Sequence, residues 1–318
     1  MNKRFLNVGQ NKENMQTEIN ISWAHSPAPK EPGIHVIADQ NLEELVPFID
    51  WFYLFYAWRI PGKFPEILEG DSPKAETARK LYADAQKLLA EAIEKKWIQA
   101  RGIFGVFPVT RSGEGLDLHS EFGTTRFEFL REQEVRDGIC KHRSLIDFIT
   151  PKETDYLGLF AVSAGFNIAE QSAQFKKAGD DYSSILLQSL GGRLTEAFSE
   201  KLHQDVMKKY WGYLPEGAKP FGIRPAPGYP TCPDHTEKLA IWKAMHVEEQ
   251  TGIKLSESYM MIPEYSTCGY YFAHPKSLYF SVGKIADDQI QDYAKRKNWS
   301  EEMAKKMAEK GIIAALLH

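Results

Sequence analysis

The chain has 318 residues, a formal net charge of −4, and a composition that is 43% hydrophobic and 26% charged. These values are typical of a globular protein with ample core material, and the acidic balance argues against a nucleic-acid-binding surface. No run approaches the ~20 apolar residues of a membrane span, and the polar N-terminus lacks the apolar core of a signal peptide. Three cysteines without a Cys-x-x-Cys pair fit a reducing compartment. We therefore expect a cytoplasmic protein with neither a membrane nor a nucleic-acid partner.

The first forty residues are polar and carry proline-containing turns at Ser26-Pro27-Ala28-Pro29 and Glu31-Pro32-Gly33. This composition is typical of chain that lies on a folded body rather than forming it. We predict an N-terminal tail or inter-domain linker over residues 1–40 and a single domain over residues 41–318.

The most aromatic stretch, Phe48–Trp58, follows a short helix start at residues 41–45 and contains one carboxylate, Asp50. Burying an unpaired charge is costly, so Asp50 is expected to meet a partner or a ligand. A helix cap or a structural ion pair would satisfy it equally well, and the residues alone leave these alternatives open.

The next segments predict a mixture of helix and antiparallel sheet. Ser72-Pro73 suits a helix start, and apolar residues recur at helical spacing up to Ala92. Short apolar or alternating runs separated by turn sequences then follow at residues 103–109, 116–119, 125–130 and 156–163. Their hairpin-like spacing favours antiparallel pairing over parallel βαβ units.

A long helix is predicted over residues 180–211, with Glu196 and His203 on one face. Gly191-Gly192 inside it costs roughly 1 kcal/mol per glycine relative to alanine, so either something packs closely there or the helix bends or restarts. Without further information, Glu196 is interpreted as a solvated helix carboxylate more readily than as a site residue.

The most constrained stretch of the chain is residues 224–238, RPAPGYPTCPDHTEK. Its prolines exclude helix and central strand from the first half, while Gly228 allows a close backbone approach by another body. Asp234 followed three residues later by Glu237 predicts a capping box and a helix start. We interpret the stretch as a rigid loop that presents Arg224 and Tyr229 to a ligand; a structural proline-rich crossover is the alternative.

After this loop we predict a helix over residues 237–250 and strands over 258–262, 269–273 and 278–285. Two short charged helices, at about 287–297 and 300–310, end the chain. Together with the earlier runs, these elements favour an α+β domain.

Several familiar motifs are absent from the sequence, including G-x-G-x-x-G, the P-loop, H-E-x-x-H and G-x-S-x-G. The Cys232-Pro-Asp-His235 segment lacks a second Cys/His pair nearby, so zinc is weakly supported. A Cys232–His235 catalytic dyad is equally weak because the two residues are three apart at a helix start. What remains is suited to recognition: Arg224 for a carboxylate, Asp50 and Glu196 for cations, and aromatic faces at Tyr229 and Tyr279.

The loop RPAPGYPTCPDHTEK resembles the signature of the activation domain of cobalamin-dependent methionine synthase. Other stretches resemble the same family in the same order: IDW at 49–51, GKFP at 62–65, RLTEAF at 193–198, YWGY at 210–213 and GYYFAHPKSLYFSVGKI at 269–285. The resemblance covers roughly residues 20–300. It implies a single α+β domain with a bent antiparallel sheet surrounded by helices.

The resemblance also implies a function: binding S-adenosylmethionine so that oxidised cobalamin is reductively remethylated. The ligand contacts that it implies fall on Asp50, Glu196, Arg224, Ala226, Gly228, Tyr229, Tyr279 and Phe280. Arg224 would meet the methionyl carboxylate, Asp50 the ammonium group, and the loop backbone the adenine. The family commonly has Tyr where this chain has Phe280, so a side-chain hydroxyl contact would be lost there and a backbone contact kept.

By the same resemblance, cobalamin is held by a partner domain, and a flavodoxin-like or diflavin reductase supplies an electron. We expect no metal ligands and no catalytic acid or base in this chain, since the transfer mainly needs donor and acceptor to be aligned. On its own the chain, part of a methyltransferase, should bind ligand without turnover. The rival hypotheses are a docking module without ligand binding and a Cys/His hydrolase or zinc protein.

Overall fold

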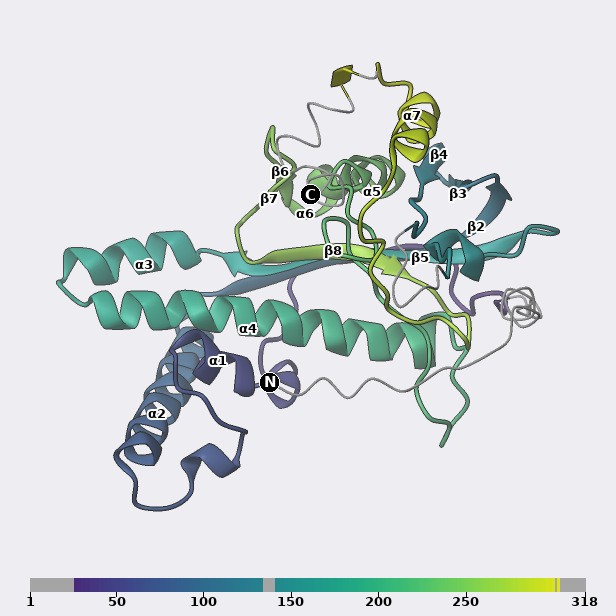
Figure 1. Ribbon diagram of the computed structural model, residues 1–318. Helices are drawn as coiled ribbons and strands as arrows, with labels where there is room; N and C mark the ends of the chain where they lie inside the picture. The colour runs from purple at the N-terminus through teal and green to yellow at the C-terminus, as the bar shows by residue number, and fades with distance from the viewer. Residues whose placement is uncertain (1–25, 134–140, 301, 304–318) are drawn as a thin grey trace, which may run out of the picture.

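The fold is built around one antiparallel sheet, seen edge-on between helices in Figure 1. The computed structural model describes residues 26–133, 141–300 and 302–303. The strands follow the order β4-β3-β2-β5-β8, with β1 paired to β2 beside β3. Their bounds are β1 Gly33–Ile37, β2 Gln99–Ser112, β3 Gly115–Ser120, β4 Gly123–Glu128, β5 Asp155–Phe166 and β8 Ser266–Tyr271.

Both faces of the sheet are buried, which explains why its central strands read as nearly continuous apolar runs. Along β2, Phe104 and Val106 belong to one core cluster, whereas Ile103 and Phe107 belong to the other. The same alternation continues across β5 and β8, because successive side chains of a strand point to opposite faces. The sheet thus separates two hydrophobic cores.

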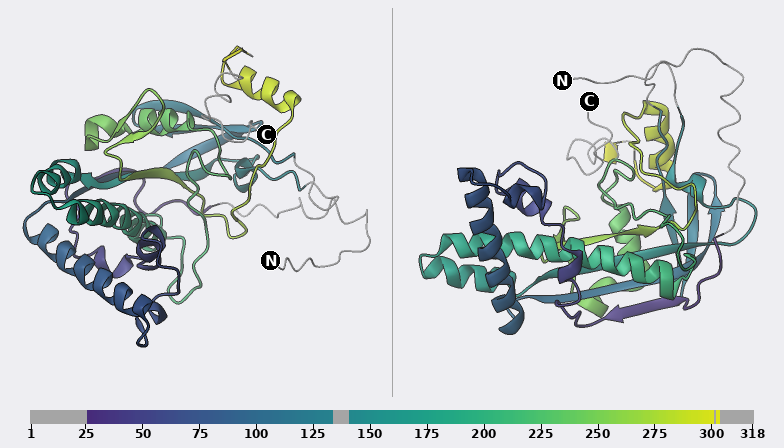
Figure 2. Two further views of the ribbon diagram at one scale, coloured as in Figure 1. Left: turned by 60° about the vertical axis from the view of Figure 1, so that its left-hand side comes forward. Right: turned by 90° about the horizontal axis from the view of Figure 1, so that it is seen from below.

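One core is covered by the helices that precede the 224–238 loop, as the two views of Figure 2 show. These are α1 Phe52–Ala57, α2 Pro73–Glu94, α3 Ile168–Lys177 and α4 Asp181–Asp205, with short 3-10 turns at Val46–Phe48 and Glu66–Leu68. The predicted start of α2 is confirmed, because the Ser72 hydroxyl accepts a hydrogen bond from the Ala75 N–H (3.1 Å). Helix α4 ends in a π-helical turn, Val206–Tyr210.

The other core is covered by α5 Glu237–Met245, α6 Val247–Thr251 and α7 Asp287–Arg296, with a 3-10 turn at Leu145–Phe148. A two-stranded ribbon, β6 Lys254–Leu255 with β7 Met261–Ile262, lies beside them. The helix predicted over 237–250 is broken at His246, whose φ of 51° ends α5. The predicted α+β class with an antiparallel sheet is confirmed.

Three sequence expectations differ from the structure. Residues 33–37, expected within a tail, form β1 and pair with β2, and His35 stacks on Phe104 across the pair with ring centroids 4.8 Å apart. Residues 278–285, expected as a strand, are extended but pair with no sheet strand among the described residues. Helix α3 was not predicted.

The helix expected over 300–310 lies mostly outside the described residues, as do residues 1–25 of the expected tail.

Within the described ranges, none of the helices combines the length and apolar composition needed to cross a bilayer.

Candidate functional site

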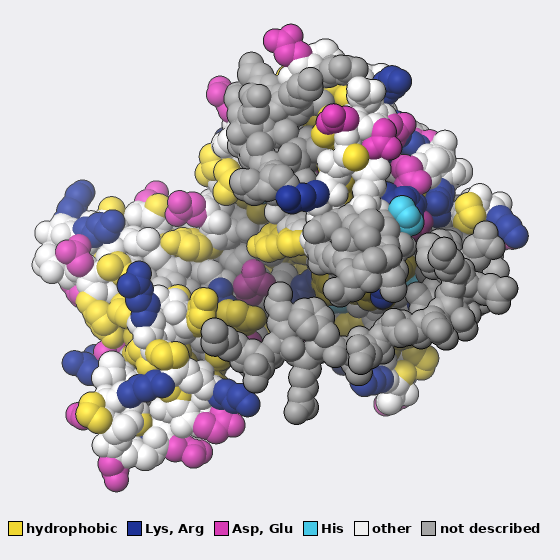
Figure 3. Space-filling model, viewed as in Figure 1, with side chains coloured by type: hydrophobic (Ala, Val, Ile, Leu, Met, Phe, Trp, Pro, Cys, Tyr) yellow, Lys and Arg dark blue, Asp and Glu magenta, His cyan; other side chains and the backbone are white. Residues whose placement is uncertain are grey.

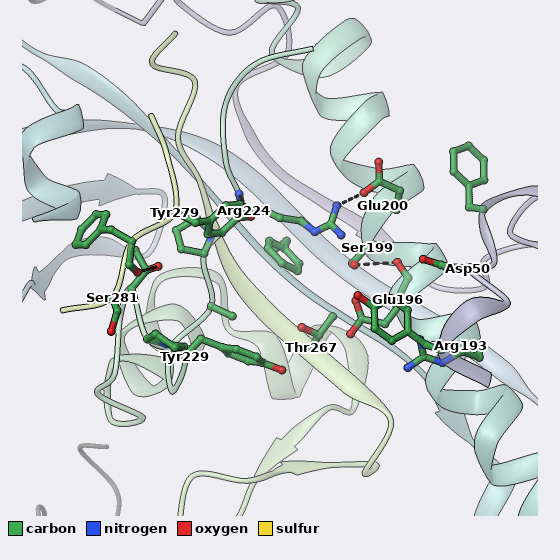
Figure 4. Close-up of a pocket in the computed structure, with 18 residues that line it drawn as sticks. Asp50, Arg193, Glu196, Ser199, Glu200, Arg224, Tyr229, Thr267, Tyr279 and Ser281 are labelled. Atoms are coloured by element: carbon green, nitrogen blue, oxygen red, sulfur yellow. Dashed lines mark hydrogen bonds and ion pairs between the residues drawn. The ribbon is translucent and has the colours of Figure 1, made fainter. Parts of the chain in front are cut away.

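A cavity of about 920 Å³ opens where α4, the start of α1, the 224–231 loop and the 279–281 segment meet over β8. Figure 4 shows charged side chains entering it from α4 and from the loop, and tyrosines from the loop and from residue 279. Its volume lies within the range of small-molecule binding sites. This cavity is the candidate site.

Helix α4 supplies one wall. Arg193, Glu196 and Glu200 recur at intervals of three and four residues and therefore share a face, which lines the cavity. Gly191 allows α4 to pack closely against α3, because a Cβ at this position would come within 2.2 Å of Ile168 Cδ1 at the start of α3. The close packing anticipated at the Gly191-Gly192 pair is therefore present, and α4 stays helical through it.

The proline-rich loop reaches the cavity by pairing with the edge of the sheet. Ile223 exchanges two backbone hydrogen bonds with Phe272 (3.0 and 3.1 Å), and the Tyr270 N–H donates to the Pro225 carbonyl (2.9 Å). A Cβ on Gly269 would lie 2.4 Å from that carbonyl oxygen, so a glycine is needed for this approach. These contacts fix Arg224 above β8.

Farther along, the loop folds over the side chain of His235. Gly228 has a φ of 97°, and a Cβ there would come within 2.2 Å of the His235 ring. The Gly228 N–H donates to the Cys232 carbonyl (2.7 Å), which closes the turn. Gly228 does not line the cavity itself; it allows the neighbouring Ala226 and Tyr229 to do so.

The segment after β8 is tied to the loop rather than to the sheet. The Thr231 hydroxyl donates to the Phe280 carbonyl (2.6 Å), and the Val282 N–H donates to the Pro230 carbonyl (2.9 Å). The Tyr279 hydroxyl accepts from the Arg224 N–H (2.9 Å). This bonding to a loop explains why the alternating pattern of residues 278–285 forms no ladder.

Arg224 is not free in this structure. Its Nη1 donates to Glu200 Oε2, while Glu200 Oε1 accepts from Gln204 Nε2 (3.2 Å). Burial opposes ionisation of Glu200, but the hydrogen bond and charge of Arg224 outweigh it and lower the pKa of that carboxyl. The site therefore contains a half-buried ion pair that the sequence analysis did not anticipate.

The other carboxylates face the cavity from exposed positions. Asp50 lies in an apolar run of the sequence, yet its side chain is exposed. It accepts a hydrogen bond from the Phe52 N–H (3.0 Å) at the start of α1. The Ser199 hydroxyl donates to the Glu196 backbone carbonyl (2.9 Å), but among the described residues the Glu196 carboxylate has no hydrogen bond or ion pair. Arg193 lies 5.3 Å over the Tyr53 ring. Asp50 thus precedes the N-cap residue of α1, Trp51, accepts a hydrogen bond from the first helical residue, and lines the cavity as well.

The structure gathers seven of the eight predicted residues around one cavity and places Gly228 beneath it. The Phe280 ring is 8% exposed, with the Arg143 guanidinium 5.2 Å from its centroid. Several lining residues were missed, and helical spacing from Glu196 could have indicated the first three of them: Arg193, Ser199, Glu200, Thr231, Thr267 and Ser281.

The segment after the loop is structural. Cys232 is buried, which raises the pKa of its thiol, and the His235 Nδ1 contacts Lys238 Nζ (3.0 Å). The predicted capping box is wrong: Thr236 precedes the first residue of α5, and Glu237 is turned inward toward Lys297. Within residues 26–133, 141–300 and 302–303, no three His, Cys, Asp or Glu side chains are grouped to hold a metal ion.

A buried ionic cluster lies behind the loop, and we call Asp234, Glu237 and Lys297 the rear cluster. Lys297 bonds Glu237 and lies 3.6 Å from Asp234, both of whose carboxylates are buried. Tyr293 of α7 donates to Asp234 (2.6 Å). The rear cluster therefore joins α7, and the residue that follows it, to the end of the loop.

Comparison with known proteins points to one family. The sequence profile described as "Vitamin B12 dependent methionine synthase, activation domain" matches residues 41–298. Among solved structures, the chain is similar to one titled "Crystal Structure of the MetH Reactivation Domain bound to AdoHcy". The two chains are 37% identical with a TM-score of 0.84, over 90% of this chain and 92% of the other.

Proposed function

Because the chain belongs to the family of activation domains of vitamin B12-dependent methionine synthase, we propose that its cavity binds S-adenosylmethionine for reductive remethylation of cobalamin. The observation that carries this proposal is the convergence of Arg224, Glu196, Asp50 and Tyr229 on one cavity. The similar crystal structure holds AdoHcy, the demethylated form of the same compound. The rival of a docking module without a ligand is not favoured, since docking alone would not need these side chains around a cavity.

The charges of the cavity match the ends of such a ligand. Arg224 would bind the methionyl carboxylate through the planar edge of its guanidinium. Asp50 and Glu196 would bind the ammonium group. The backbone at Ala226, with Tyr229 beside it, would bind the adenine. A sulfonium over the Tyr279 ring would gain about 0.5–2 kcal/mol from a cation–π contact.

The protein's part in the reaction would be alignment. The C–S bond to the methyl carbon would break with its electron pair left on sulfur. The methyl group would go to cobalamin held by another domain of the synthase, after one electron from the reductase has reduced the oxidised cobalamin. The Arg224 and Glu196 contacts would hold the amino-acid end, so the methyl group faces the open side of the cavity. An acid or base is unnecessary, and this chain alone would bind ligand without turnover.

The open side of the cavity is suited to a docking partner. Tyr53, Tyr229 and Tyr279 around it are 50%, 63% and 58% exposed. Figure 3 shows hydrophobic side chains gathered over α1 and the adjoining part of α4. Exposed aromatic residues are common in protein interfaces. We assign this face to the cobalamin-binding domain. A flavodoxin-like or diflavin reductase would be the electron donor. The residues before β1 would form a linker between modules.

Calorimetry with S-adenosylmethionine tests the proposal. The wild-type chain should bind saturably, and Arg224→Ala should weaken binding at least tenfold, because a hydrogen-bonded charged group contributes about 1.5–3 kcal/mol. Arg79→Ala is the matched control, since Arg79 bonds the Leu68 and Gly70 carbonyls, remote from the cavity. Equal affinities in wild type and Arg224→Ala would refute the assignment.

A further inference from the structure

Glu200 holds Arg224 in the way that a ligand carboxylate would. Its Oε2 accepts from Arg224 Nη1, and Gln204 holds its other oxygen (3.2 Å), as Figure 4 shows for the first of these contacts. The backbone end of Arg224 is separately fixed by the Tyr279 hydroxyl (2.9 Å). Arg224 is therefore positioned by its backbone without Glu200, while its charge is occupied by Glu200.

The charge of the cavity gives this pairing a consequence. Asp50, Glu196 and Glu200 line the cavity against two cations, Arg193 and Arg224. When Glu200 is paired with Arg224, the two remaining carboxylates, Asp50 and Glu196, favour positively charged groups of a ligand. The positive charge of Arg224, which would bind the ligand's carboxylate, is already partly neutralised. The Arg224 side chain is only 23% exposed, and an unpaired charge at such a position would be destabilising. Glu200 therefore also stabilises the ligand-free protein by pairing with this cation.

We infer that Glu200 is a specificity-determining residue, an internal carboxylate that competes with the ligand's own carboxylate for Arg224. This inference rests on the proposed binding of S-adenosylmethionine. In either of two binding modes, Glu200 weakens the binding of a ligand carboxylate. If the ligand displaces Glu200, the ion pair must be broken; if Glu200 stays, the two carboxylates repel one another.

The test compares two ligands that differ only in the contested group, S-adenosylmethionine and decarboxylated S-adenosylmethionine. Glu200→Gln removes the charge and keeps an oxygen able to accept from Arg224. It should increase the preference for the carboxylate-bearing ligand, measured as the ratio of the two dissociation constants, by about two- to fivefold, the range set by partly exposed ion pairs.

Two controls separate this effect from others. Glu248→Gln removes one acid that is paired to Lys254 at 3.4 Å, remote from the cavity, and should leave the ratio unchanged. In an Arg224→Ala background, Glu200→Gln should change the ratio less, because the contested cation is gone and only direct repulsion between the two carboxylates is left. A thermal melt of each variant establishes that it is folded; Glu200 is 42% exposed, so its replacement is tolerated.

The outcomes are distinct. A higher ratio in Glu200→Gln, with a smaller change or none in the Arg224→Ala background, supports competition. An unchanged or lower ratio overturns it, the lower value being what a residue that merely positions Arg224 would give. Absence of S-adenosylmethionine binding by the wild-type chain would refute the proposed function at an earlier step, and this inference with it.

Discussion

Charged residues at the two ends of the 224–238 loop have opposite environments. At its start, the cavity presents Asp50 and Glu196 from exposed positions, with Arg224 only half buried. At its end, Asp234 and Glu237 of the rear cluster are buried, and both carboxylates form ion pairs with Lys297. Charge type alone therefore does not mark a binding site. Asp50 and Glu196 face a cavity from the surface, whereas the rear cluster pairs its charges inside the fold.

The largest effect is expected from breaking the rear cluster. Lys297→Met leaves two buried carboxylates without their cation and should lower the free energy of unfolding by about 3–5 kcal/mol in urea denaturation. Lys254→Met, which breaks an exposed pair with Glu248, should cost less than about 1 kcal/mol. Similar losses in both variants would contradict the difference between buried and exposed charges.

The next effect depends on pH. His203 of α4 is 7% exposed and stacks on Tyr271 with ring centroids 5.0 Å apart. Burial, with the nearby Arg224 charge, lowers the pKa of His203 to about 4. The unfolded chain therefore takes up a proton first, so stability is complete above about pH 6.5 and falls by about 2–3 kcal/mol toward pH 4.

His203→Phe keeps the ring stacking and removes the titration, so its urea-unfolding stability should fall less than that of wild type between pH 6.5 and 4. His119→Phe, at an exposed position, should leave the wild-type profile unchanged. If His203→Phe lost stability over this range as steeply as wild type, the assignment to His203 would be wrong.

The sequence predicted the regular elements and most of the cavity but not the environment of individual charges. Helical spacing located α2 and α4, and alternation located β2 to β5, because these patterns follow from burial on one or two faces. The family signature identified Arg224 and its neighbours. Asp50 was expected to meet a partner or a ligand because apolar residues surround it in sequence; it is exposed at the start of α1, where it accepts a backbone hydrogen bond from Phe52.

Long-range pairing accounts for what could not be predicted. The rear cluster joins Asp234 to Lys297, and charged residues are exposed by default, so no local pattern marks them as buried. The Glu200–Arg224 pair joins a helix to a distant loop, although the spacing of Glu200 from Glu196 was a usable signal. Residues 278–285 alternate like a strand, but their partners are loop carbonyls rather than a ladder.

On the cavity side, Glu196→Gln should affect binding and leave stability nearly unchanged. It removes a carboxylate without a partner among the described residues, so S-adenosylmethionine affinity should fall by about 1–2 kcal/mol in calorimetry. The free energy of unfolding should stay within about 0.5 kcal/mol. A stability loss comparable to that of Lys297→Met would place Glu196 among the structural charges instead.

The smallest effect is expected at Tyr279, which belongs to both the cavity and its support. Tyr279→Phe removes the hydroxyl that accepts from the Arg224 N–H and keeps the ring, so binding should weaken by about 1 kcal/mol or less. Tyr56→Phe, 70% exposed on α1, is the control and should bind like wild type. A loss as large as that of Arg224→Ala would mean that the hydroxyl itself contacts the ligand.

The most direct test of the account is a crystal structure of the chain with S-adenosylmethionine bound. We expect the ligand in the cavity between α4 and the loop, its carboxylate within hydrogen-bonding distance of Arg224, its ammonium group facing Asp50 and Glu196, and the rear cluster unchanged. A ligand bound elsewhere, or one whose carboxylate points away from Arg224, would contradict the division between charges that bind and charges that support.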